Sequence, residues 1–263
     1  MKILLTNDDG FDAPGINVLR ERLLYDDHTV YVMAPASNQS GTSQSIHMGG
    51  GMKVREIDEN FYTCAGSPAD CVLTAIHGKF FERPDILLSG INRGPNLGLD
   101  ILYSGTCGAA RQAVLMGIPS AALSVMWPGD EIVASEDEGD YYAMADFAAK
   151  NLKTLASLAN VAKDGLMPKE KCVFPNVNGM AQSKSYKGAK FAAVSFREYM
   201  EDKVTLKELE PGLYDRTFSG GRVNSVSREY SDYDACVEGY AAVTRLYAEP
   251  SAAPALDGIA FKV

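Results

Sequence analysis

Four short polar clusters contain most of the side chains in this sequence that could do chemistry. Each cluster follows an apolar run or opens a stretch with helical periodicity. They are Asn7-Asp8-Asp9-Gly10, Asn38-Gln39-Ser40-Gly41, Ser89-Gly90-Ile91-Asn92 and Tyr103-Ser104-Gly105-Thr106. Adjacent carboxylates, a hydroxyl and a side-chain amide are hard oxygen ligands of the kind that Mg²⁺, Mn²⁺ and Ca²⁺ prefer. A glycine-rich helix start adds backbone N–H groups that can bind an anion. The pattern predicts a metal-dependent phosphate site.

The adjacent acids Asp8 and Asp9 are the strongest part of this pattern. An isolated pair of this kind often forms turns or caps a helix. Two carboxylates in a small volume repel one another, however, and a shared cation removes that cost. Ser40 and Asn92 have plain interpretations as loop and turn residues, but both offer neutral oxygen atoms that would bind a cation without repelling phosphate. Metal binding accounts for all four residues together.

The helix start at Ser104-Gly105-Thr106 is the candidate for binding phosphate. Ser104 or Thr106 could simply be the N-cap of the helix. That role is compatible with anion binding, because a helix start has unpaired N–H groups and a partial positive charge. Asn96 in the preceding loop could add a side-chain donor. The sequence has no Walker motif, G-x-S-x-G, H-E-x-x-H or complete G-x-G-x-x-G after a strand, which disfavours serine hydrolases, zincins and dinucleotide oxidoreductases.

Alternating strands and helices must bring these clusters together. Apolar runs predict core strands over residues 3–6, 29–33, 85–89, 120–125 and 172–176. Helical periodicity and capping signals predict helices over residues 14–24, 68–78, 105–117 and 141–159. This alternation is typical of a doubly wound α/β sheet with helices on both faces. Because the carboxyl ends of parallel strands meet at one edge, the four clusters are expected to converge there.

The sequence changes character after Asn178. Residues 186–196, 204–214 and 222–226 are predicted to be strands joined by polar turns. We expect a core over residues 1–178 and a C-terminal arm and oligomerisation segment over residues 179–263, from which residues 231–246 return to the core. An arm with little helical cover has exposed strand edges, and proteins commonly protect such edges by pairing with another subunit. A homo-oligomer is therefore expected.

The composition and net charge of the chain limit which binding partners and which cellular compartment are expected. The chain has 263 residues, a formal net charge of -9 and a pI near 4.9. This charge disfavours binding to nucleic-acid polymers and anionic membranes, and no apolar run approaches the roughly 18 residues of a membrane span. The five cysteines include no C-x-x-C pair, which favours reduced, buried thiols. Because the chain opens on a core-strand pattern rather than a secretory leader, we expect a cytoplasmic protein.

Together with Gly66-Ser67-Pro68-Ala69-Asp70-Cys71 and the run from Ser89 to Gly98, the clusters resemble the SurE-type nucleotidase family. The resemblance is strong over residues 1–125 and returns at Asn176-Val177-Asn178 and in pieces between 231 and 244. It implies a Rossmann-like three-layer α/β/α sandwich with a mostly parallel sheet and a C-terminal extended β-hairpin arm exchanged between subunits. It also implies a divalent-metal-dependent phosphatase that hydrolyses nucleoside 5′- and 3′-monophosphates, and some members of the family accept short polyphosphate.

The resemblance assigns roles to residues of the clusters. The ligands of one divalent cation per subunit, Mg²⁺ or Mn²⁺, would be Asp8, Asp9, Ser40 and Asn92. The phosphate pocket would be lined by Asn96, Ser104, Gly105 and Thr106. The predicted reaction is attack of water on a nucleoside monophosphate, in which Asp8 or Asp9 takes the proton of that water. Asp8 is the preferred base. The subunits would form a homodimer or a homotetramer.

Three departures from the family pattern leave the proposed ligands intact but affect packing and substrate preference. The chain has Gln112-Ala113 in place of Glu-Gly, Gly179-Met180 in place of Val-Pro, and Thr244-Arg245-Leu246 in place of Thr-Pro-Leu. A noncatalytic nucleotide or phosphate sensor would keep the same ligands, so this alternative stays open. A receiver-like signalling module is the weaker alternative. It needs a phosphoacceptor aspartate at the end of a middle strand, and the matching strand ends in Ser89.

Overall fold

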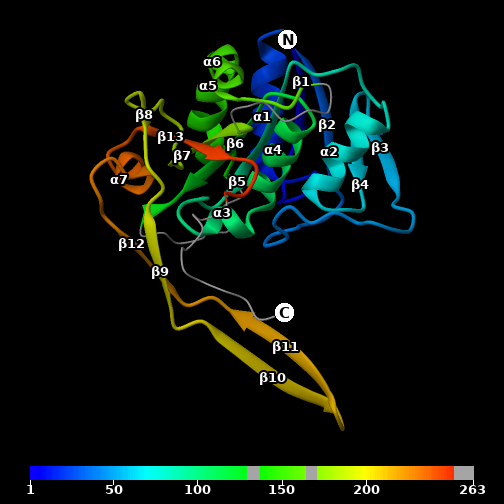
Figure 1. The fold of residues 1–263 in the computed structure, drawn as a ribbon, viewed down its shortest axis with the longest axis vertical. Helices are drawn as coiled ribbons and strands as arrows, with labels where there is room; N and C mark the ends of the chain where they lie inside the picture. The colour runs from blue at the N-terminus through cyan, green and yellow to red at the C-terminus, as the bar shows by residue number, and fades with distance from the viewer. Residues whose placement is uncertain (129–136, 164–170, 252–263) are drawn as a thin grey trace, which may run out of the picture.

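A nine-stranded sheet forms the centre of the protein in the computed structural model, which describes residues 1–128, 137–163 and 171–251 (Figure 1). The strands, in spatial order, are β3 (Val54–Asp58), β4 (Phe61–Cys64), β2 (Thr29–Pro35), β1 (Lys2–Thr6), β5 (Ile86–Arg93), β6 (Ser120–Met126), β7 (Val173–Met180), β13 (Ala241–Tyr247) and β8 (Ala189–Phe191). The strands from β4 to β7 in this order are parallel, while β3, β13 and β8 run the opposite way. The mostly parallel sheet confirms the predicted fold class.

Alternation of side chains along the strands builds a core on each face of the sheet. In β1, Ile3 and Leu5 pack into one core and Leu4 packs into the other. The first face is covered by α1 (Pro14–Tyr25), α5 (Tyr142–Lys150) and α6 (Leu152–Leu158). The second face is covered by α2 (Pro68–His77) and α4 (Gly105–Leu115). Each fully buried leucine contributes roughly 1.5–3 kcal/mol, so a strand that is apolar on both sides is held between two helical layers.

The long helix predicted over residues 141–159 is interrupted. The structure has a 3-10 turn, η2 (Glu138–Tyr141), followed by α5 and α6, which are separated at Asn151. The Asn151 side chain donates to the Phe147 carbonyl at 2.8 Å, the acceptor that its backbone N–H would use in a continuous helix. That N–H donates to the Ala148 carbonyl instead, at 3.1 Å. The side chain competes with the backbone and ends the helix there.

The C-terminal arm extends from the core as a hairpin (Figure 1). It consists of β10 (Lys203–Glu210) and β11 (Leu213–Ser219), which pair antiparallel and have only exposed residues. At its base, β9 (Phe196–Met200) pairs antiparallel with β12 (Arg222–Val226). Two predictions are wrong here. The strand predicted over 204–214 contains a turn at Pro211-Gly212, where Gly212 has a φ of 82°. The strand predicted over 186–196 is split, because 192–195 separate β8 from β9.

After the arm, the chain returns to the sheet through α7 (Asp232–Val237) and β13. β13 pairs antiparallel with β7, with Val243 opposite Val177. The last residues of the predicted arm segment, 252–263, lie outside the described residues. All five cysteines are buried and have free thiols. In the described ranges, no helix is both long enough and apolar enough to cross a membrane.

Candidate functional site

The loops that follow β1, β2 and β5 meet at one edge of the sheet, because β1 pairs with both of the other strands. The backbone N–H of Gln39 donates to the Asp8 carbonyl at 2.7 Å, and the N–H of Arg93 donates to Asp9 Oδ2 at 2.9 Å. The first bond ties the acidic pair to the loop that carries Ser40. The second ties it to the end of β5, which carries Asn92. The residues predicted as metal ligands therefore lie at the carboxyl ends of neighbouring strands.

Asp8 lies against the start of α4. It is 4% exposed, and the Thr106 hydroxyl donates to its carboxylate. Burial raises the pKa of Asp8, while hydrogen bonds from Thr106 and from the backbone of Gly105 oppose that rise. A side chain at Gly105 would not fit, because its Cβ would lie 2.8 Å from the Cβ of Asp8. The helix start that was predicted to bind phosphate thus also holds a carboxylate of the acidic pair.

Asp9 is the less buried of the two acids. Burial, followed by the negative charge of Asp8, raises the pKa of Asp9 to about 6. The backbone N–H and the positive charge of Arg93 act in the opposite direction. Ionising two adjacent, largely buried carboxyl groups is costly, and a cation bound between them would remove that cost. The acidic pair therefore fits a metal ion.

Ser40 and Asn92 can add neutral oxygen ligands. Ser40 is exposed, and its loop is fixed by its N–H, which donates to Asn38 Oδ1 at 2.9 Å. Asn92 Nδ2 donates to the Gly94 carbonyl at 2.9 Å, so the amide oxygen is the atom left for a cation. Within the described residues, no group of three or more His, Cys, Asp or Glu side chains could hold a metal. Two carboxylates with neutral oxygens suit Mg²⁺ or Mn²⁺ better than zinc.

Asn96, which was predicted to bind phosphate, is anchored by hydrogen bonds to β6 and β7. Its N–H donates to Asn178 Oδ1 at 2.8 Å, and its carbonyl accepts from Asn176 Nδ2 at 2.9 Å. Its own Nδ2 donates to Ser124 Oγ at 2.8 Å, which leaves the second amide proton for a ligand. Asn176 and Asn178 stand two residues apart on β7, so both side chains point to the same face. That spacing was the available signal for their supporting role.

Ser104 has the N-cap role that its position predicted. Its Oγ accepts a hydrogen bond from the Cys107 N–H at 2.9 Å at the start of α4. The hydroxyl proton of Ser104 is still able to donate to a phosphate. Thr106 differs from Ser104, because it is fully buried and its hydroxyl is bonded to Asp8.

A cavity of about 220 Å³ lies among these residues. Five of the eight predicted site residues line it, namely Asp8, Ser40, Asn92, Asn96 and Ser104. Gly105 and Thr106 are buried and do not belong to the lining. Asp9 lines a neighbouring cavity of about 190 Å³, and Arg93 lines both cavities. Asp8 therefore lines the larger of these two neighbouring cavities and Asp9 lines the smaller one.

Three residues that line the larger cavity lie outside the four clusters and outside the run from Ser89 to Gly98. They are Asp100, Arg197 and Val223. Arg197 belongs to β9 and Val223 to β12, so the base of the arm forms part of the cavity wall. Asp100 forms an ion pair with Arg197. Sequence spacing could not reveal this pair, because 97 residues separate the two positions and their contact depends on how the arm folds back.

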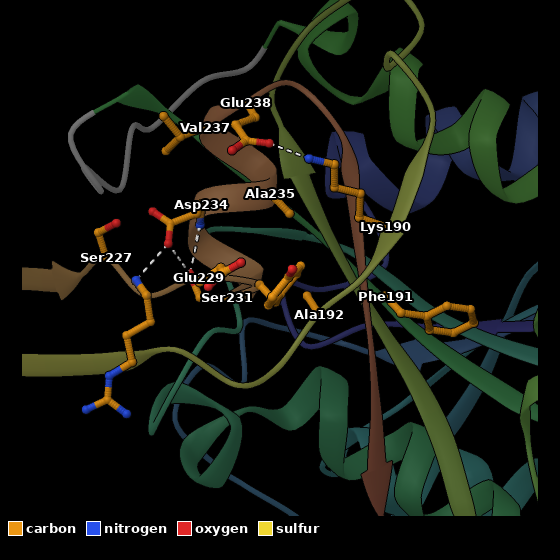
Figure 2. Close-up of a pocket in the computed structure, with 12 residues that line it drawn as sticks. Lys190, Phe191, Ala192, Ser227, Glu229, Ser231, Asp234, Ala235, Val237 and Glu238 are labelled. Carbon is orange, nitrogen blue, oxygen red and sulfur yellow. Dashed lines mark hydrogen bonds and ion pairs between the residues drawn. The ribbon is translucent and has the colours of Figure 1, made fainter.

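A third cavity, of about 340 Å³, lies beside α7 (Figure 2). Lys190 pairs with Glu238 there, and Asp234 accepts hydrogen bonds from the Ser231 hydroxyl at 2.7 Å and the Arg228 N–H at 2.8 Å. None of the eight predicted site residues lines this cavity. Lys190 and Glu238 neutralise one another, and Asp234 is held by its two hydrogen-bond donors. The cavity at the sheet edge therefore remains the candidate for chemistry.

Known proteins resemble this chain over most of its length. The sequence model of a family described as "Survival protein SurE" matches residues 3–201. A protein named 5′-nucleotidase SurE from Geotalea uraniireducens is 36% identical over 256 residues, which cover 94% of this chain and 93% of the relative. A protein of the same name from Desulfitobacterium hafniense is 32% identical over 252 residues, which cover 95% of this chain and 92% of the relative.

Two further comparisons concern a shorter match and a solved structure. A 5′-nucleotidase SurE from Geotalea daltonii is 44% identical over 155 residues, a match that spans 59% of either protein. The crystal structure of the SurE protein from Aquifex aeolicus is similar with a TM-score of 0.71 and 34% sequence identity, and the match covers 95% of both chains.

Proposed function

This chain belongs to the SurE family, and on that premise we propose that it is a 5′-nucleotidase that uses one divalent cation to hydrolyse nucleoside monophosphates to nucleoside and phosphate. The family match and the names of the curated relatives support the nucleotidase activity. The observation that carries the proposed site is the buried acidic pair at the end of β1, next to a cavity lined by hydroxyl and amide groups. Carboxylates bind a cation, and the neutral donors bind the phosphate.

The proposed ligands of the cation are Asp8, Asp9, Ser40 and Asn92. When bound there, Mg²⁺ or Mn²⁺ would polarise water and neutralise charge on the phosphoryl oxygens. The raised pKa values of the two acids support this assignment, because burial of adjacent carboxyl groups is costly without a counter-charge. The neutral oxygens of Ser40 and Asn92 complete the set without repelling a phosphate.

The residues around the cavity are proposed to take up the proton of the attacking water and to bind the phosphate. Asp8 lines the cavity, and its carboxylate is the proposed base that takes the proton of the attacking water. The Thr106 hydroxyl keeps that carboxylate in one orientation. The Asn96 amide and the Ser104 hydroxyl bind the phosphoryl oxygens of the substrate and keep these contacts through the reaction. Gly105 lies behind the cavity lining, and its lack of a side chain lets the start of α4 lie against Asp8.

Phosphate release from a panel of substrates tests this function. The panel contains nucleoside 5′- and 3′-monophosphates, a sugar phosphate and tripolyphosphate, each with Mg²⁺, Mn²⁺ or a chelator. We expect metal-dependent release that Asp9→Asn lowers by at least about a hundredfold, because the cation loses a charged ligand. Asp27→Asn is the matched control, since Asp27 is an exposed residue after α1 with a φ of 57°, which asparagine tolerates. Full activity of Asp9→Asn would refute the proposed site.

The same panel decides the finer points of the proposal. We include 3′-monophosphates and short polyphosphate as substrates because of the resemblance to the family. A folded parent chain that binds metal and phosphate without releasing phosphate from any substrate would favour the noncatalytic sensor. The five free thiols and the acidic composition support our further proposal that the enzyme works in the cytoplasm.

We also propose that the chain forms a homodimer or a homotetramer through its arm. No element within the described residues covers the hairpin of β10 and β11, and its large apolar side chains are more than half exposed. Such a surface is typical of an interface between subunits.

A further inference from the structure

The base of the arm is hydrogen-bonded to the loop that forms one wall of the candidate site. Arg197 on β9 donates through Nη1 to one carboxylate oxygen of Asp100, and the Tyr199 hydroxyl donates to the other. Both oxygens of Asp100 are thus held by the same strand. We call Asp100, Arg197 and Tyr199 the arm clamp.

The ion pair of the arm clamp is largely buried. The Arg197 side chain is 2% exposed and that of Asp100 is 23% exposed. Gly98 packs directly on the arginine, because a Cβ at this position would lie 2.9 Å from Arg197 Cγ and 2.9 Å from the Ser195 carbonyl oxygen. The φ of Gly98 is 53°, a conformation that favours glycine. The close approach of the two backbones therefore depends on this glycine.

The clamped segment carries the residues proposed to bind phosphate. Asp100 opens the short helix α3 (Asp100–Tyr103), and Ser104 follows it directly as the N-cap of α4. Asn96 lies just before Gly98 on the other side of the clamp. Hydrogen bonds to Asn176 and Asn178 of β7 hold the backbone of Asn96 in place. The segment between Asn96 and Ser104 is joined to the arm through Asp100.

We propose that Arg197 is a positioning residue for the phosphate site, acting through Asp100 to hold the wall formed by residues 96–104. Because this inference rests on the proposed function, it names a further residue of that site rather than another activity. The base of the arm then serves catalysis as well as any assembly of subunits. A small displacement of a substrate-binding group can cost an enzyme about a hundredfold, which is expected here in kcat/KM, so the fixed position of this wall has a measurable effect.

The effect is expected in substrate binding more than in turnover. Asn96 and Ser104 bind phosphate in the ground state and in the transition state alike, so weakening both raises KM more than it lowers kcat. Asp8 and Asp9 lie on other loops and keep their geometry. We expect Arg197→Ala to raise KM for a nucleoside monophosphate by about tenfold to a hundredfold, with kcat within about threefold of the parent.

The experiment compares Arg197→Ala, Arg197→Lys, Asp100→Asn and the double variant with the parent. The matched control is Arg222→Ala, which removes an exposed arginine of β12 that pairs with Glu201 at 2.9 Å and does not line the cavity. Lysine keeps the charge but lacks the planar guanidinium, so Arg197→Lys should recover part of the loss. If Arg197 acts through Asp100, the double variant should be no worse than the weaker binder of the two single variants.

A second readout is independent of turnover. Calorimetric titration of each protein with inorganic phosphate, in the presence of Mn²⁺, should show the same loss of affinity for Arg197→Ala as the rise in KM. Tyr199→Phe removes a single hydroxyl of the clamp, and it replaces Arg197→Ala as the test variant if Arg197→Ala does not fold. An inactive parent would reject the proposed function, while phosphate titration would still compare the variants.

Two results would overturn the role of the clamp. One is a KM and a phosphate affinity for folded Arg197→Ala that equal those of Arg222→Ala. The other is an effect of the double variant equal to the product of the single effects, because independent action of Arg197 and Asp100 would then be shown.

Discussion

At the scale of single residues, the acidic pair gives the protein a defined response to pH. Asp9 has a pKa of about 6 in the folded protein, whereas an unperturbed aspartate has one near 3.9. A group whose pKa is raised on folding stabilises the fold at low pH. That contribution is lost as the pH rises through the folded value. The metal-free protein therefore carries an unfavourable charge at neutral pH, which a cation would neutralise.

This balance predicts how stability depends on pH. For the metal-free parent, we expect the free energy of unfolding to fall between about pH 4 and pH 7 by up to roughly 3 kcal/mol relative to Asp9→Asn. Urea denaturation in the presence of a chelator measures both profiles. Adding Mn²⁺ should reverse the difference at pH 7, because the ion binds the ionised pair of the parent. Parallel profiles for the two proteins without metal would contradict the prediction.

A second prediction concerns the contact between Asp8 and α4. Gly105→Ala should destabilise the protein by about 1–3 kcal/mol and weaken Mn²⁺ binding, because the new Cβ would lie 2.8 Å from Asp8 Cβ and 3.0 Å from Pro68 Cγ. Gly49→Ala is the matched control, since no atom lies within 4 Å of a Cβ there. Thermal denaturation and metal titration compare the two variants. Equal behaviour would show that the α4 start can move away from Asp8.

At the scale of elements, the start of α2 shows how a loop near the site is attached to the core. Ser67 and Asp70 form a capping box, and the Ser67 hydroxyl also donates to the Ser45 carbonyl at 2.6 Å. Asp70 further accepts hydrogen bonds from the N–H and the ring of His47. One helix cap therefore holds both its own helix and the chain that follows the Ser40 loop.

Because Ser67 holds two segments, its removal is expected to lower the free energy of unfolding more than the removal of an ordinary N-cap. Ser67→Ala should lower the free energy of unfolding by about 1–3 kcal/mol, because the Asp70 N–H and the Ser45 carbonyl both lose their partner. Ser157→Ala in α6 removes an exposed hydroxyl that donates to the Thr154 carbonyl at 2.7 Å, and it should change stability by less than about 0.5 kcal/mol. Urea denaturation distinguishes the two costs. A cost for Ser67→Ala no larger than that for Ser157→Ala would contradict this account.

The elements also show what the sequence could predict and what it could not. Buried parallel strands such as β1 and β5 are marked by apolar runs, and α2 is marked by its cap at Ser67, because these signals are local. The break at Asn151 and the turn at Pro211-Gly212 were missed, although both have local signals that periodicity alone does not contain. The arm clamp joins Asp100 to Arg197 through tertiary folding, and no pattern within one segment encodes that contact.

At the scale of the whole molecule, the arm has an apolar face that is left exposed by the part of the chain that the structure describes. Val204 and Leu206 stand two residues apart on β10, so their side chains lie on the same face of the hairpin. Phe218 and Tyr214 of the paired strand β11 lie on that face as well. These four side chains are between 52% and 61% exposed. A patch of this kind, extended from the core (Figure 1), suits contact with a second copy of the chain.

Assembly through this face predicts a change in mass. Leu206→Asp should shift the protein toward smaller species in light scattering at micromolar concentration, because a charge on the apolar face must be desolvated in the interface. Lys207→Asp places the same side chain on the opposite face and should leave the mass unchanged. A parent chain that is monomeric at about 100 times that concentration would contradict assembly through the arm.

The pairing of β13 with β7 also sets an order on the biosynthesis of the protein. Among the described residues, β7 forms the last parallel strand, and its outer edge pairs with β13, which lies beyond the whole arm in the chain. A ribosome that has completed β7 must therefore finish the hairpin and α7 before this edge can be closed. Throughout that interval the nascent sheet ends in an open edge that can pair with another chain. Translation that stops within the arm would release a product prone to aggregation.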